Sequence, residues 1–200
     1  MIRISAKQIT LFKTLIHGLN LGFILTWYYW AFTDQLGADP VKTIIHFTGM
    51  GALNLLLLTL LVSPAARYLK QAQLVKLRRL FGLYCFTWAL LHVSNYIVFD
   101  LQMAFDTLLQ DIIKRPYITV GFAAFIALLA LAITSNQFSQ KKLNKRWHSL
   151  HKIIYPASLL IALHFIWSVK ALDLEPVIYW LLLLVLLATR TRFVQRRLFT

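Results

Sequence analysis

Residues 117–135 read YITVGFAAFIALLALAITS, a run that contains no charged side chain. A helix needs about 20 consecutive, mostly apolar residues to cross a hydrocarbon core of ~30 Å. The run has this length, and a polar pair, Arg115-Pro116, stands immediately before it. It therefore predicts a helix that spans a membrane.

Further apolar runs predict additional spans elsewhere in the chain, at about residues 15–33, 44–62, 80–99, 150–169 and 177–189. Proline-containing segments lie between several of them, and each is interpreted as a helix end or a turn: LGADP at 36–40, SP at 63–64, RP at 115–116 and EP at 175–176. The sequence thus predicts an all-α fold, a six-helix transmembrane bundle. Residues 1–200 are expected to form a single integral membrane domain.

The charges are few and unevenly distributed. Only 14% of the residues are charged, against about 25% in an average soluble domain. Most of the 21 basic residues lie before the first predicted span, in the second and fourth loops or after the last span, whereas all 7 acidic residues lie in the other three loops. Because cytoplasmic loops are rich in Lys and Arg, both termini are predicted to be cytoplasmic. The net charge of +14 is thereby assigned to topology and to anionic lipid rather than to nucleic acid.

Two histidines lie deep in the predicted spans. An ionisable side chain at membrane depth is costly, so it marks a functional site by default. His92 and His164 lie roughly 4 and 7 Å beyond the midpoints of the third and fifth spans. Both spans run outward in the predicted topology, so the two imidazoles reach a similar depth in the outer half of the bilayer. They are predicted to ligate one metal between two helices, and a hydrogen-bonded packing role is the alternative.

Two imidazoles on facing helices suit a six-coordinate heme that transfers electrons. No thiolate or carboxylate accompanies them, which argues against iron-sulfur, zinc and carboxylate-bridged sites. The absence of a C-x-x-C-H motif argues against covalently attached heme. Heme b is therefore the predicted cofactor. One face of the third span fits either a porphyrin wall or an ordinary packed face, with Cys85, Trp88, His92, Asn95 and Tyr96 at helical spacing.

His151 precedes His164 by about 20 Å of helix, a separation that suits a second cofactor nearer the cytoplasm. The matching end of the third span holds Arg78 and Arg79, which offer no axial ligand. An ideal helix also turns the two histidines about 140° apart, and Pro156 between them is expected to distort it. His151 is predicted to contact an inner cofactor, with His148, His17 or a non-protein ligand as its partner.

The other histidines have simpler interpretations. His148 follows Trp147 in a basic loop and is expected in the headgroup region. His17 is expected to pack. His46 is expected to make a structural hydrogen bond, with a heme propionate or a quinone as the alternative contact, and the nearby Gly49 and Gly51 predict a close approach of helices.

Several segments resemble one known family across nearly the whole chain: LGADPVKTIIHFTG at 36–49, SPAARYL at 63–69, RRLFGLYCFTWALLHVSNY at 78–96, RPYITVG at 115–121, KRWHSLHKIIYP at 145–156 and HFIWSVK at 164–170. The family is that of the heme-binding membrane subunits of periplasmic protein-methionine-sulfoxide reductase systems, MsrQ or YedZ. It belongs to the ferric-reductase-like transmembrane proteins. In that group, histidines of the third and fifth helices ligate heme.

The resemblance places the family's third-helix histidine on His92 and its fifth-helix histidines on His151 and His164. Larger relatives carry two histidines on the third helix, and here an Arg occupies the inner position. The resemblance therefore implies one heme, or two if His151 finds another partner.

The resemblance further implies an electron-transfer subunit in a bacterial inner membrane, without substrate catalysis of its own. Its partner would be a periplasmic molybdopterin-containing reductase that repairs oxidised methionine in proteins. The quinone pool or a cytoplasmic flavin reductase would supply electrons, and FMN would be an additional cofactor.

Two other classes of function remain open at this stage. A small proton or cation transporter would use the intramembrane histidines as relays. A membrane scaffold would only recruit a soluble partner. The transporter interpretation has to work without any Asp or Glu inside the predicted spans.

Overall fold

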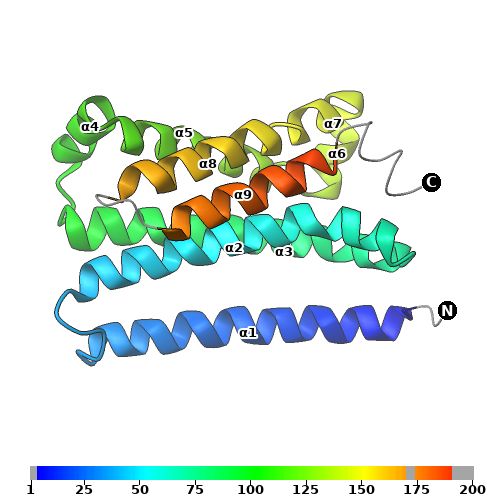
Figure 1. The fold of residues 1–200 in the computed structure, drawn as a ribbon, viewed down its shortest axis with the longest axis horizontal. Helices are drawn as coiled ribbons and strands as arrows, with labels where there is room; N and C mark the ends of the chain where they lie inside the picture. The colour runs from blue at the N-terminus through cyan, green and yellow to red at the C-terminus, as the bar shows by residue number, and fades with distance from the viewer. Residues whose placement is uncertain (1–3, 170–173, 191–200) are drawn as a thin grey trace. The chain divides into compact units, whose positions relative to one another are not determined.

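The computed structural model describes residues 4–169 and 174–190, and within these ranges the ordered elements are helices (Figure 1). The prediction of an all-α fold is confirmed. The chain divides into two compact units, one ending at Ala104 and the other starting at Phe105.

The first unit contains three long helices and two short helical segments: α1 (Ala6–Phe32), α2 (Pro40–Tyr68), the 3-10 segment η1 (Ala72–Leu77), α3 (Arg78–Asn95) and the π-helical segment η2 (Tyr96–Asp100). Local sequence fixes the helix starts. Ser5 caps α1 in a capping box with Gln8. Asp39 caps α2, and Pro40 takes the first helical position, where its missing N–H costs nothing.

The second unit contains six helices among its described residues: α4 (Phe105–Lys114), α5 (Pro116–Ile133), α6 (Gln137–Leu143), α7 (Lys145–His151), α8 (Ile154–Ser168) and α9 (Leu174–Ala188). Short helices α4, α6 and α7 lie where the sequence predicts loops or span ends. Lys170 and Asp173, which belong to a predicted acid-bearing loop, lie outside the described residues, as do residues 191–200 of the basic tail.

Five helical segments are long and apolar enough to cross a bilayer: Ala6–Phe32, Pro40–Tyr68, Ala72–Asp100, Pro116–Ile133 and Lys145–Ser168. They coincide with the first five predicted spans, although most extend further into polar sequence. The sixth predicted span coincides with α9, which has 15 residues and measures ~22 Å at 1.5 Å per residue. Because this is shorter than a hydrocarbon core of ~30 Å, a sixth crossing stays a prediction.

Pro64 lies inside α2, so the prediction that Ser63-Pro64 ends a helix is wrong. Proline removes one backbone donor, and spanning helices tolerate that loss where neighbouring groups compensate. Pro64 is buried, and the helix continues to Tyr68. The remaining proline boundaries agree with the structure, since Pro40 and Pro116 each open a helix.

The fifth span is interrupted between His151 and His164, as the position of Pro156 predicts. Helix α7 ends at His151 and α8 starts at Ile154. Proline at 156 has no N–H to donate to the carbonyl oxygen of Lys152, and that oxygen accepts a bond from the Tyr155 N–H at 3.1 Å instead. The two histidines are therefore not carried on one continuous helix.

In the first unit, small residues and polar pairs hold the helices together. A Cβ on Gly51 would overlap the Trp88 ring, which confirms the predicted close approach of α2 and α3. The Trp88 indole donates to the Asn20 Oδ1 of α1 at 2.8 Å. The Tyr28 hydroxyl of α1 donates to the Asn95 Oδ1 of α3 at 2.7 Å. These bonds satisfy polar groups that the bilayer core would leave without water.

Candidate functional site

His92 lies near the end of α3 and points its Nδ1 at the backbone of α2. The distance from Nδ1 to the carbonyl oxygen of Ile45 is 2.9 Å. A carbonyl can only accept, so Nδ1 carries a proton, and in the neutral ring Nε2 then carries the lone pair. Gly49, one turn after Ile45, makes the approach possible, because a Cβ there would lie 3.0 Å from Nδ1.

His164 has the same arrangement in the second unit. Its Nδ1 lies 2.7 Å from the carbonyl oxygen of Tyr117 on α5. Gly121 stands one turn after Tyr117, and a Cβ there would lie only 2.5 Å from Nδ1. The Tyr117 ring stacks beside the imidazole with 6.1 Å between centroids. The tautomer is again fixed, with the lone pair on Nε2.

The two arrangements match residue for residue, and we call each of them a histidine cradle. It consists of a carbonyl at one position, a glycine four residues later, and a histidine 47 residues after the carbonyl on the antiparallel helix. Outer-shell hydrogen bonds of this kind fix the tautomer and ring orientation of metal-bound histidines. Each cradle thus presents a neutral imidazole in the form that binds a metal through Nε2.

The sequence predicts both histidines but not the residues that hold them. The role of a glycine depends on a side chain more than 40 residues away, which local patterns cannot reveal. The one available signal is the repeated spacing of glycine and histidine in the two halves of the chain. Neither Gly49 nor Gly121 is assigned to cofactor binding from the sequence alone.

His151 has a different environment. Its Nε2 lies 3.1 Å from the Thr134 Oγ1, and its ring stacks on Trp147 with 3.9 Å between centroids. The Thr134 hydroxyl is 2.7 Å from the carbonyl oxygen of Ala130, to which it donates. With its proton on that carbonyl, the hydroxyl oxygen accepts from Nε2 of His151, and the lone pair of the neutral imidazole then lies on Nδ1. His151 thus differs from the two cradle histidines in tautomer and in partner.

The sequence predicts that one face of α3 forms either a porphyrin wall or a packed surface. In the structure, most of that face packs against other helices of the first unit. Cys85, Trp88 and Asn95 are all buried, and Asn95 also donates to the Thr48 Oγ1 at 3.4 Å. These contacts favour the packed-face interpretation for the three residues. His92 is half-buried between them.

The remaining histidines lie on exposed positions. His17 is exposed, and its Nδ1 lies 2.6 Å from the Tyr84 hydroxyl. His148 is exposed and meets the Trp147 ring edge-on at 5.2 Å between centroids, and its position in the headgroup region stays a prediction. His46 is exposed as well.

Known proteins resemble this chain over most of its length. The family described as ferric reductase like transmembrane component matches residues 47–162, a range that includes His92 and His151 and ends two residues before His164. A protein of Salmonella arizonae is 50% identical over 193 residues, covering 95% of this chain and 96% of its own. One from Salmonella paratyphi B has the same identity and coverage.

Both relatives are named protein-methionine-sulfoxide reductase heme-binding subunit MsrQ. Half of all aligned positions are identical, and the alignment covers the segments that carry the two cradles. The chain therefore belongs to the MsrQ family of ferric-reductase-like transmembrane proteins.

Proposed function

We propose that this chain carries electrons across the bacterial inner membrane through b-type heme whose axial ligands are His92 and His164. The observation that carries the proposal is the pair of matched cradles. In both, Nδ1 donates to a helix carbonyl, so the coordinating lone pair resides on Nε2. Iron bound by two imidazoles supplies reversible one-electron transfer.

The residues around each imidazole support the fit. The carbonyl oxygens of Ile45 and Tyr117 orient the rings and increase the basicity of Nε2. Gly49 and Gly121 leave the space in which the rings lie. The donor set consists of neutral nitrogen ligands, which suits heme iron better than calcium or magnesium.

His151 is proposed to contact an inner cofactor, either a second heme or FMN. The family resemblance supports this role, and the half-buried ring stacked on Trp147 offers a flat aromatic surface. Ligation through Nε2 would require His151 to leave the Thr134 hydroxyl. The hydrogen bonds around His151 as a heme ligand would therefore differ from those that orient His92 and His164.

The electron acceptor is proposed to be a periplasmic molybdopterin-containing methionine sulfoxide reductase. The names of the relatives, which call them subunits of a protein-methionine-sulfoxide reductase, support this assignment. The electron donor is proposed to be the quinone pool or a cytoplasmic flavin reductase. The chain itself would relay electrons without binding the oxidised methionine.

Reduced-minus-oxidised spectra of the detergent-purified protein test the heme proposal. The parent is compared with His92→Ala, His164→Ala, His151→Ala and, as an exposed control, His148→Ala. We expect a low-spin b-type signal that each cradle variant abolishes and that His148→Ala leaves unchanged. A partial loss in His151→Ala would indicate a second heme. A parent that stays colourless after heme-supplemented expression would overturn the proposal and favour a transporter.

Electron delivery tests the partner separately. Reduced protein in liposomes is mixed with the soluble reductase and a methionine-sulfoxide substrate, and the heme absorbance is followed. We expect reoxidation only when the reductase and the substrate are both present. Unchanged absorbance in the complete mixture would contradict the proposed acceptor while leaving heme binding intact.

A further inference from the structure

Helix α4 carries an apolar stripe on its exposed side. Phe105, Leu109 and Ile113 are 57%, 60% and 81% exposed. Side chains four residues apart lie above one another on one helix face, so the three form a single ridge, which we call the α4 stripe. Thr107 lies on the opposite face and is exposed as well. An exposed apolar ridge on a two-faced helix indicates a binding surface.

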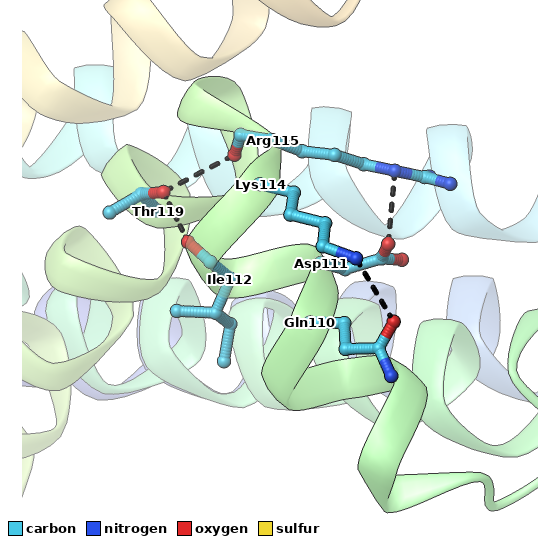
Figure 2. Close-up of polar contacts among 6 residues, drawn as sticks. All are labelled: Gln110, Asp111, Ile112, Lys114, Arg115 and Thr119. Carbon is cyan, nitrogen blue, oxygen red and sulfur yellow. Dashed lines mark hydrogen bonds and ion pairs between the residues drawn. The ribbon is translucent and has the colours of Figure 1, made fainter.

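Polar contacts fix this helix to the first turn of α5 (Figure 2). Only Arg115 separates the two helices, and its guanidinium pairs with the Asp111 carboxylate at 3.0 Å. The Thr119 hydroxyl of α5 lies within hydrogen-bond distance of the carbonyl oxygens of Ile112 and Arg115. Asp111 is buried at this junction. The α4 helix is therefore held at a set angle to α5.

The junction marks the point at which a membrane-spanning α5 would leave the bilayer. Helix α5 is among the helices long and apolar enough to span a membrane, and it starts at Pro116. A ten-residue helix joined to that start by one residue stays within about 15 Å of that point. Lys114 is exposed at its end and can place its ammonium group among lipid headgroups while its stem stays in apolar surroundings.

We propose that α4 is an interfacial anchor that lies flat in the membrane surface, with the α4 stripe inserted among the acyl chains. Helices with one apolar and one polar face bind in this way and bury their apolar side about 5–10 Å into the headgroup boundary. Because α4 lies in one of the acid-bearing loops, the predicted topology places it on the periplasmic side of the membrane. The proposal concerns lipid contact alone and does not depend on heme.

Nitroxide labels on full-length protein in phosphatidylethanolamine and phosphatidylglycerol vesicles test it. Leu109→Cys reports on the stripe and Thr107→Cys is the matched control on the same helix. Cys85 is the sole native cysteine and is buried, so parent protein provides the unlabelled blank. Collision rates with oxygen, which concentrates in lipid, are compared with those of a water-soluble nickel chelate.

We expect the oxygen-to-nickel collision ratio at Leu109 to exceed that at Thr107 by at least fivefold. Equal ratios, with both labels open to the nickel chelate, would overturn the proposal and leave the stripe to a soluble protein partner. If Leu109→Cys fails to yield folded protein, Phe105→Cys and Ile113→Cys report on the same stripe. A wild-type reduced-minus-oxidised spectrum in the labelled variants would show that the label tests the lipid contact without disturbing the proposed heme site.

Discussion

At the scale of single residues, Gly121 should be the cradle glycine at which an added methyl group reduces heme binding most. A methyl group there would lie 2.5 Å from Nδ1 of His164, so the imidazole must move and give up its 2.7 Å bond to Tyr117. We expect Gly121→Ala to weaken heme binding by roughly 10- to 100-fold, the usual effect of disturbing an outer-shell partner. Heme content per protein, read from the reduced spectrum, measures it.

Gly49→Ala and Gly82→Ala provide a graded comparison. The new Cβ would lie 3.0 Å from His92 Nδ1 in the first variant, so a small shift suffices and a smaller loss is expected. In the second it would lie 3.8 Å from Thr59, an ordinary contact, and no loss is expected. Alanine favours helix by about 1 kcal/mol over glycine, so reduced helix propensity cannot explain a loss. Equal heme content in all three variants would contradict the role of the cradles.

The sequence singles out His92 and His164 as candidate ligands, but it does not predict the residues that surround them. Membrane depth singles out His92 and His164, because burying an ionisable group in lipid is costly regardless of its neighbours. The tautomer depends on one carbonyl oxygen on another helix, and no local pattern encodes that contact. The partner of His151 cannot be predicted from the sequence either, since its bond to Thr134 depends on how α7 packs against the end of α5.

At the scale of secondary-structure elements, α1 depends on α3 for its polar contacts. Trp88 is 4% exposed and its indole N–H is satisfied by Asn20. Asn20→Leu would leave that donor buried without its partner, at a cost of about 1–3 kcal/mol in the free energy of unfolding. Denaturant unfolding in detergent micelles measures the change.

A double-mutant cycle separates this bond from general packing. Trp88→Phe removes the donor, so adding Asn20→Leu to it should cost less than Asn20→Leu costs in the parent. Strictly additive losses would show that the hydrogen bond contributes nothing to holding α1. Leu19→Ala is a suitable control on α1, because Leu19 is 61% exposed and points away from this contact.

Hydropathy locates the spanning helices well and their ends poorly. Helix α1 starts at Ala6, well before residue 15, because the capping box of Ser5 and Gln8 starts it in polar sequence. Helix α4 is not found by a search for long apolar runs, because it is short and amphipathic. Pro64 gives a false helix boundary, because a proline removes a single backbone donor and α2 continues past it to Tyr68.

At the scale of the whole molecule, the distribution of charge predicts orientation. Alkaline phosphatase is active only outside the cytoplasm, so fusions at turn residues report the side of each loop. We expect activity for a fusion after Gln102 and none after Asn144, two turn positions with positive φ. A fluorescent protein at the C-terminus should fold and emit in the cytoplasm. The reverse pattern would overturn the assignment of both termini to the cytoplasm.

The position of the boundary between the units has a consequence for assembly. Each unit holds a complete cradle, carbonyl, glycine and imidazole together. Cutting the polypeptide between Ala104 and Phe105 would sever none of these contacts. The contacts of the two cradles therefore do not require a continuous chain, and two separately translated halves would each carry one intact cradle to a shared membrane.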